Sequence, residues 1–380
     1  MRHRVTRAVA AAGVVAAVAS TGGTSAAVSR PEPARVEEPF TGATADSRFI
    51  GYGAACLTGA RRGTAAEEAT NHPLRGCRRD PAGPVPPGHA APHGYLQLTD
   101  AHMEETGAVL FDSPIPAADG LVVTFEQWQY GNTTRAPADG ISFFLTDGSR
   151  RLTTPGAFGG SLGYAQKLPG GKAGGQFVPG VDGGYLGIGL DALGDYFGDG
   201  ERRGNGCERR SPAGTSLRQS PPGPNIVTAR GAGNGTTGYC LLAATTDNKT
   251  TTGPWPSSLP GHLHGDLRKM PADVAPDEAE ELLEPVRRTV RVALSFGPDP
   301  VATVDIDFED GEGFQRVLKF SAPEPVPDTF KFGFAASTGP LTDVQLIRKV
   351  VVRPQESEES RRMPGNRRSG EREGRPTAGR

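Results

Sequence analysis

The sequence predicts an all-β protein, an antiparallel sandwich with long Gly/Pro-rich loop insertions. Its 380 residues include 53 glycines and 34 prolines, the two poorest helix formers. Apolar and polar residues alternate in short segments bounded by Gly, Pro and Asp turns, a pattern typical of half-buried strands. The hydrophobic fraction of 36%, with 16 phenylalanines, is sufficient for a core. Strands without crossover helices leave a sandwich, a jelly roll or a barrel.

Predicted strands follow one another through most of the chain. In residues 290–294 and 304–308 the alternation is plain, so one face of each strand is expected to meet the core. The only predicted helix is Pro276–Glu284, with Pro276 in its first turn. The predicted strands are Gly94–Leu98, Gly107–Phe111, Leu121–Trp128, Ile141–Leu145, Tyr185–Leu190, Ile226–Arg230, Val290–Phe296, Ala302–Phe308, Val317–Phe320, Phe330–Ala335 and Val344–Val352. The long predicted loops are Thr58–His93, Gln166–Gly180, Gly200–Pro224 and Thr246–Asp273.

The first residues are typical of a secretory signal. Arg2, Arg4 and Arg7 precede the apolar run Ala8–Val18, which is too short to span a bilayer, and small residues follow it. We assign residues 1–29 to this signal and expect a secreted, extracellular protein.

Disordered segments are predicted on both sides of one folded domain. Residues 30–45 are rich in Pro and Glu and form the expected lead-in, and residues 46–353 form the sandwich. Residues 354–380 contain almost no apolar side chains, so we expect a disordered tail.

The charge is balanced, with 41 basic and 43 acidic residues and a net charge of −2. This balance argues against nucleic acid or an anionic membrane as the main partner. No stretch after the signal reaches the length of a transmembrane helix, so no membrane span is expected.

Four cysteines in an exported chain favour disulfides. Cys56 and Cys77 bracket one loop, and Cys207 and Cys240 bracket another, so sequential pairing is the simplest of three possible connectivities. Each closure is expected to add about 3–4 kcal/mol in the chain-entropy account. Metal binding by these residues is not expected, because no two of them are closely spaced.

Four segments, in this order, resemble the L-type (legume-like) lectin domain, a concanavalin-like jelly-roll sandwich. They are Ala138–Leu145, Gly159–Tyr164, Gly184–Asp191 running on to Asp195, and Phe332–Gly339. The segment Arg230–Tyr239 is similar to a loop of bacterial members, and the Arg/Ala/Gly/Pro-rich composition also indicates a bacterial source. The resemblance covers roughly residues 45 to 353. It implies a non-catalytic carbohydrate-binding protein whose partner is a saccharide, although fold alone does not fix function.

The resemblance also implies site residues. Asp139 matches the sugar-binding carboxylate that follows a cis peptide bond, and Gly160, beside Gly159, matches the backbone donor. Asp195 stands where the family has an Asn. The remaining implied sugar-binding residues are Leu193 and Tyr196 as apolar platform, and Thr338 and Gly339 in the specificity loop.

The metal site implied by the resemblance is incomplete. Gly189 replaces the family's metal-binding Glu, and no His occurs in 201–206, so no transition metal is expected. A calcium half-site remains arguable, because carboxylate and carbonyl oxygens are hard ligands. Its candidate ligands are Asp191, Asp195, Asp199 and the Leu193 carbonyl.

Other readings stay open. Asp139-Gly140 and Gly159-Gly160 also fit simple turns. A glycoside hydrolase would need paired carboxyl groups, for which Asp305, Asp307 and Glu309 are the best candidates. A structural or adhesive cell-wall protein with a degenerate sugar site is the main alternative.

Overall fold

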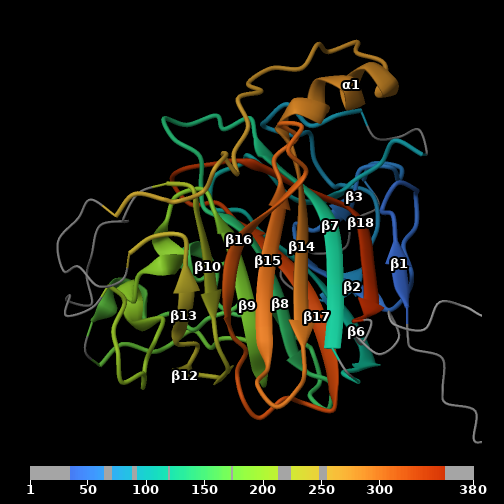
Figure 1. The fold of residues 1–380 in the computed structure, drawn as a ribbon. Coiled ribbons are helices and arrows are strands. Elements are labelled where there is room, and N and C mark those ends of the chain that lie inside the picture. The colour runs from blue at the N-terminus through green and yellow to red at the C-terminus, as the bar shows by residue number, and fades with distance from the viewer. Residues whose placement is uncertain are drawn as a thin grey trace, which may run out of the picture. The chain divides into compact units, whose positions relative to one another are not determined.

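The computed structural model describes residues 35–63, 71–87, 92–118, 120–172, 174–212, 224–247 and 255–355. The predicted signal and residues 356–380 of the predicted tail lie outside these ranges. The described chain forms two antiparallel sheets packed face to face, with one α-helix, α1 (Pro276–Leu283), near one end of the strands (Figure 1). The predicted all-β sandwich is therefore confirmed.

The first sheet has eight strands and is paired antiparallel throughout. Its central pair is β7 with β18, and β1 (Val36–Glu38) pairs with β18 outside the main path. The order is β16 (Phe314–Ser321), β15 (Val301–Asp307), β14 (Arg287–Ser295), β7 (Gly120–Tyr130), β18 (Val344–Pro354), β5 (Leu96–Asp100) and β3 (Cys56–Leu57).

The second sheet has ten strands and lies behind the first in the view of Figure 1. Its order is β12 (Thr237–Gly238), β11 (Gly233–Asn234), β9 (Gly184–Asp191), β8 (Gly140–Asp147), β17 (Thr329–Ser337), β6 (Thr106–Pro116), β2 (Phe49–Gly53) and β4 (Asn71–Pro73). In addition β10 (Ile226–Arg230) pairs with β9 and with β13 (Leu241–Ala244).

The core between the sheets follows the alternation in the sequence. On β14 the residues Val290, Val292 and Leu294 are buried, whereas their neighbours in between are partly exposed. Phe125 of the first sheet lies 5.9 Å from Phe143 and 4.9 Å from Phe334 of the second, measured between ring centroids. Burial of these rings, worth about 1.5–3 kcal/mol each, joins the two layers.

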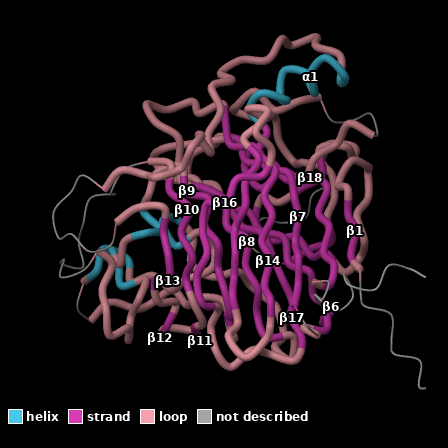
Figure 2. The backbone as a smooth tube through the Cα atoms, viewed as in Figure 1, coloured by secondary structure: helices cyan, strands magenta, loops and turns pink. Residues whose placement is uncertain are grey.

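A second cluster covers the far face of the second sheet. On β9, Ile188 faces the core, whereas Gly187 and Gly189 face the other way. A Cβ atom at Gly187 would lie 2.2 Å from Tyr164, and one at Gly189 would lie 2.3 Å from Tyr196, so both rings pack directly on bare backbone. Loops and short 3-10 turns, visible beside the strands in Figure 2, supply these tyrosines.

Residues 30–45 were predicted to be a disordered lead-in, but residues 36–38 form a strand. Val36–Glu38 forms β1 against β18, and the Glu38 carboxylate accepts hydrogen bonds from the backbone N–H groups of Phe40 and Asp46. The sequence pattern did not predict β1 to β4 because these strands have only two to five residues, and β1, β2 and β4 contain charged residues, Gly or Pro.

Both predicted disulfides form, Cys56–Cys77 and Cys207–Cys240, with separations of 21 and 33 residues. Within the described ranges, the structure contains no helix with the length and apolar character needed to cross a membrane.

Candidate functional site

Three strands of the second sheet bring the candidate site together at one end. The register pairs Gly140, the first residue of β8, with Ser337 of β17 on one side and Asp191 of β9 on the other. Asp139 precedes Gly140 after a cis Ala138–Asp139 peptide bond. Its backbone N–H donates to the Ser337 carbonyl, and its own carbonyl accepts from Leu193. The start of β8 and the ends of β9 and β17 therefore meet around Asp139.

The Ser337 hydroxyl connects Asp139 with the glycine loop. It donates to Asp139 Oδ2 at 2.8 Å and accepts from the backbone N–H of Gly159 at 3.0 Å. Gly159 begins the short 3-10 turn η1 (Gly159–Ser161), whose first N–H groups have no acceptor within the turn. The structure thus brings the predicted carboxylate and the predicted backbone donor loop together.

Gly160 is a glycine because two groups approach it closely. A Cβ atom there would lie 2.5 Å from Asp195 Cβ and 2.5 Å from Arg203 Nη2. Gly160 is buried and joins the η1 turn to the loop that carries Asp195, while Gly159 is partly exposed.

The Asp139 carboxylate is 7% exposed, and burial raises its pKa to about 6. The hydrogen bond from Ser337 opposes this rise, and so do the positive charges of Lys167 and Arg203. Lys167 and Glu201 form a partly exposed ion pair at 3.4 Å. Burial also raises the pKa of Asp195, which is partly exposed.

Asp191 organises the loop that follows β9. Its Oδ1 accepts from the N–H groups of Leu193 and Gly194 at 3.0 and 2.6 Å, and its Oδ2 accepts from Tyr196 at 2.6 Å. The side chain is fully buried, which raises its pKa to about 7. Asp191 therefore acts as a cap for backbone donors of the loop.

Two of the four predicted calcium ligands, Asp191 and Asp199, are engaged by the protein itself. Besides the capping bonds of Asp191, Asp199 Oδ1 is 3.0 Å from Arg230 Nη1, and Asp199 Oδ2 accepts from the Ser211 N–H at 2.7 Å. The Tyr196 ring lies against Gly189, where the resemblance places a metal-binding Glu. An ion at this position would compete with the N–H donors that both carboxylates already accept from, and Asp199 is already neutralised by Arg230.

Two predicted sugar contacts differ from expectation. Tyr196 is fully buried, with its ring on Gly187 and Gly189, so it does not form the exposed platform. Leu193 is partly exposed, so it can still serve as the apolar platform. The Thr338 hydroxyl donates to the His102 carbonyl at 2.6 Å, so its side chain faces the protein.

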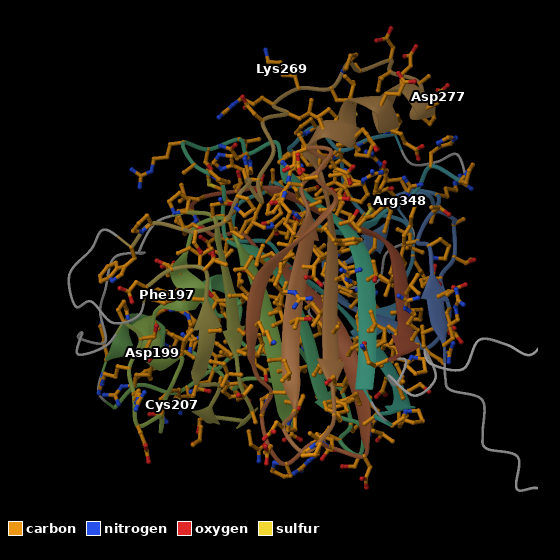
Figure 3. All side chains as sticks on the ribbon, in the orientation of Figure 1. Phe197, Asp199, Cys207, Lys269, Asp277 and Arg348 are labelled. Atoms are coloured by element: carbon orange, nitrogen blue, oxygen red, sulfur yellow. A yellow bond between two sulfur atoms is a disulfide. The ribbon has the colours of Figure 1, made fainter. Side chains whose placement is uncertain are left out.

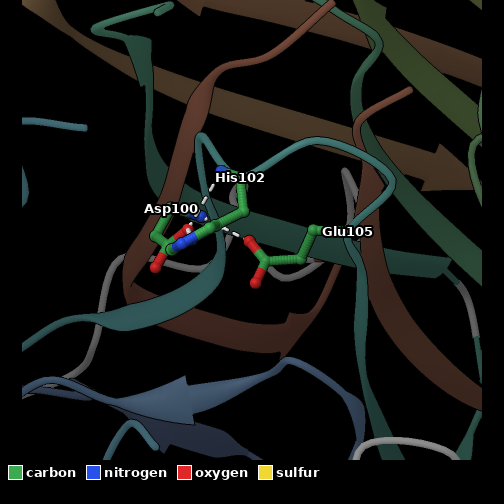
Figure 4. A group of neighbouring side chains, drawn as sticks. All are labelled: Asp100, His102 and Glu105. Atoms are coloured by element: carbon green, nitrogen blue, oxygen red, sulfur yellow. Dashed lines mark hydrogen bonds and ion pairs between the residues drawn. The ribbon is translucent and has the colours of Figure 1, made fainter. Parts of the chain in front are cut away.

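The 100–105 loop holds the end of β17. Asp100, His102 and Glu105 are the group of potential metal ligands whose atoms lie within 4.8 Å of one another in the described parts of the chain (Figure 4). Asp100 contacts His102, and Glu105 accepts from the Asp100 N–H and from Arg79. Burial raises the pKa of Glu105 to about 8.

The same loop anchors the predicted specificity loop through backbone contacts. Glu105 N–H donates to the Thr338 hydroxyl, Thr338 N–H donates to the Glu105 carbonyl, and Glu104 N–H donates to the Gly339 carbonyl. We therefore assign the cluster a structural role in holding Thr338 and partly exposed Gly339.

The acids considered for hydrolysis lie on or just after β15 of the first sheet, and two of them, Asp305 and Glu309, are paired with arginines. Asp305 of β15 is 3% exposed and pairs with Arg291 and Arg316. Glu309 pairs with Arg287 at 2.9 Å, and Asp307 accepts from the Glu309 N–H. The arginines neutralise Asp305 and Glu309, which does not favour either as the acid or nucleophile of a hydrolase.

A cavity of about 440 Å³ adjoins the site. Pro137 and Ala192, the neighbours of the Ala138–Asp139 bond and of Asp191, contribute to its wall together with Asn225, His262 and His264. Neither Asp139 nor Asp191 lines it, so the cavity adjoins the carboxylates without containing them.

Sequence reasoning missed Ser337, Lys167, Arg203 and Arg230. Ser337 lies within the last of the four lectin-like segments, so the resemblance could have pointed to it. Its contact with Asp139 could not be predicted from the sequence. The two arginines are surrounded by charged and Gly-rich sequence that is typical of exposed loops, yet Arg203 is 4% and Arg230 is 0% exposed.

No family model matches this sequence, and no curated protein matches it. Solved structures that resemble it include lectin domains. The exoplasmic/lumenal domain of VIP36, in a form bound to Ca²⁺ and Man3GlcNAc, is 17% identical, covers 71% of this chain and 84% of that chain, and gives a TM-score of 0.39. Metal-free lectin I-B4 from Griffonia simplicifolia is 14% identical, covers 83% and 98%, and gives 0.41.

A seed lectin from Lotus tetragonolobus is 13% identical, covers 84% of this chain and 97% of that chain, and gives a TM-score of 0.41. At such low identities and scores, the likeness does not decide function. Function is therefore inferred from the contacts of this chain's own residues.

Proposed function

We propose that this chain is a secreted, non-catalytic, lectin-like protein that binds a saccharide around Asp139. The observation that carries the proposal is the Ser337 hydroxyl, which contacts both the Asp139 carboxylate and the Gly159 N–H. Residues 198 positions apart along the chain are thereby held in one polar cluster.

The chemistry of the cluster suits a sugar. A carboxylate offers about four lone-pair sites, and Ser337 occupies one of those of Asp139, so acceptor capacity remains for sugar hydroxyl groups. Hydrogen bonds to a charged group are stronger than neutral ones. Partly exposed Asp195, Lys167 and Glu201 add polar partners, and Leu193 offers an apolar surface for a ring face.

Further features support a binding role outside the cell. The acids Asp305 and Glu309 are paired with arginines, which does not favour hydrolysis. Two disulfides are typical of exported proteins. Affinity per site is expected to be weak, because a shallow polar site exchanges water for sugar hydroxyls with little net gain. Strong attachment would then require several sites at once.

The test is a glycan array with the intact protein and two matched variants. Asp139→Asn removes the charge from the proposed site and keeps the side-chain shape. Loss of a hydrogen bond to a charged group costs about 1.5–3 kcal/mol, so we expect binding to fall by about tenfold or more.

Asp147→Asn is the control, because Asp147 ends the same strand β8 at its opposite end and caps the Ser149 N–H. Its binding should equal that of the unmodified protein. Equal binding by both variants would place the sugar elsewhere. Absence of any glycan signal would favour the structural cell-wall alternative, and release of reducing sugar would indicate a hydrolase.

A further inference from the structure

Two buried guanidinium groups, those of Arg203 and Arg230, hold the loop between Asp191 and Arg203. Arg230, the last residue of β10, is fully buried. Its Nε donates to the Tyr196 carbonyl at 2.8 Å, and its Nη2 donates to the Phe197 and Gly198 carbonyls at 3.2 and 3.0 Å. Its Nη1 donates to Asp199 at 3.0 Å. Arg230 thus neutralises one carboxylate and holds three consecutive carbonyls. Phe197 and Asp199 are labelled on this loop in Figure 3.

Arg203 closes the loop from its other side. Its Nη1 donates to the Asp195 carbonyl and to the Gly198 carbonyl, both at 2.7 Å. Its Nη2 lies against Gly160, next to Asp195 Cβ. The side chain is 5% exposed, and its charge lowers the pKa of both Asp139 and Asp195 against the effect of burial. Arg203 therefore joins the loop to the η1 turn.

The two arginines supply what a cation would supply in such a loop. A divalent ion held by carboxylates and carbonyls neutralises negative charge and fixes oxygen positions. Here guanidinium groups hold the carbonyls of residues 195–198 and the Asp199 carboxylate, backbone N–H groups satisfy Asp191, and the Tyr196 ring lies against Gly189. Arg230 also lies 5.4 Å from the centroid of that ring.

We propose that Arg203 and Arg230 replace a metal ion in this loop, so that its conformation and any saccharide binding it supports are independent of calcium. Both arginines are positioning residues. Arg203 acts through Asp195 and Gly160, and Arg230 acts through the carbonyls of residues 196–198 and the Asp199 carboxylate. Only the glycan part of the inference rests on the proposed function.

The first experiment tests the loop without any ligand. Thermal unfolding and hydrogen exchange of the full chain are measured in calcium chloride and in EDTA. We expect superimposable unfolding curves and equal amide protection of residues 191–203 in both solutions. A midpoint raised by calcium and lowered by EDTA, with loop protection that follows the ion, would overturn the proposal.

The second experiment removes one guanidinium. Arg203→Met should increase hydrogen exchange in residues 191–203 and reduce glycan binding by about tenfold or more, since the carbonyls it holds lose a charged donor. Arg203→Lys, which retains a cationic nitrogen able to reach both carbonyls, should restore much of both properties. Unchanged loop protection in Arg203→Met, or failure of Lys to rescue it, would contradict the positioning role.

The matched control is Arg291→Met, which removes a guanidinium paired with Asp305 on the first sheet. It should leave the 191–203 loop protection and glycan binding unchanged. If the unmodified protein binds no glycan, the proposed function fails, whereas the calcium and hydrogen-exchange comparisons still decide the role of the arginines.

Discussion

At the residue scale, the candidate site depends on how one hydroxyl group is placed. Ser337 is fully buried and connects Asp139 with Gly159, so a neutral donor orients the acid. A buried carboxylate with one such partner keeps lone pairs free for a ligand. Its ionised form is less stable than in water, and this raises the pKa of Asp139.

This raised pKa predicts acid-sensitive binding. The ionised Asp139 carboxylate accepts stronger hydrogen bonds from sugar hydroxyls than the protonated acid does, and its pKa is about 6. Saccharide affinity should therefore be constant above about pH 7 and fall by about tenfold towards pH 5, where the protonated form dominates. Titration of affinity against pH by calorimetry measures this. A flat profile across this range would show that Asp139 does not accept from the ligand, and Asp139→Asn should lose the pH dependence.

Motif similarity predicted Asp139, Gly159 and Gly160 at this scale, because backbone-defined features leave a sequence signature. It did not predict that Tyr196 is buried or that Thr338 turns inward. Those outcomes depend on side-chain packing between loops, for example of Tyr196 on Gly189, which no local pattern encodes.

At the element scale, long strands were predictable and short ones were not. The alternation that identified Val290–Phe296 and Ala302–Phe308 corresponds to β14 and β15, because burial of one face imposes a period of two residues. By contrast β4, β11 and β12 have two or three residues each and little apolar character, and β13 is apolar but only four residues long. Within the described residues, the predicted loop Thr58–His93 contains the strand β4, which the sequence did not predict. The structure of the long loops depends on contacts with distant elements, such as the Lys167–Glu201 ion pair.

The two disulfides should differ in their effect on the site. Cys207–Cys240 ties the segment after Arg203 to the chain that follows Arg230, whereas Cys56–Cys77 lies near β3 on the first sheet. Each should stabilise the fold by about 3–4 kcal/mol in the chain-entropy account. We expect both double Ser variants to melt at lower temperature, and only Cys207→Ser/Cys240→Ser to weaken glycan binding as well. Equal binding losses in the two variants would contradict a local role.

At the scale of the whole molecule, buried acids set the pH dependence of stability. Burial raises the pKa of Asp343 to about 7 and that of Glu105 to about 8. Asp343 lies just before β18 with no exposed surface, and its Oδ1 is 3.3 Å from His264 Nε2, without hydrogen-bond alignment. The folded state thus holds protons on these groups more tightly than the unfolded chain does.

The sign of the effect follows from linkage. Between the unfolded pKa values near 4 and the folded values, the native state binds more protons, so the free energy of unfolding falls as pH rises. We expect a melting temperature several degrees higher at about pH 5.5 than at about pH 8.5. Calorimetry at both values measures it, and Asp343→Asn should reduce the difference. A higher melting temperature at the alkaline value would show that these acids ionise freely in the fold.

Composition and alternation were enough to predict the sandwich, because two sheets with one buried face each are a solution that many sequences reach. They could not predict which loops cross the far face of the second sheet, since that depends on where a strand leaves its backbone bare, as β9 does at Gly187 and Gly189.

The hydrogen bond between Ser337 and Asp139 also constrains when recognition can begin during biosynthesis. Ser337 ends β17, which lies between β8 and β6 in the sheet. While β17 is still inside the ribosome, the growing chain lacks the hydroxyl group that orients Asp139. Premature termination upstream of this strand would yield a product unable to recognise its ligand, and ligand capture would report that translation had passed this point.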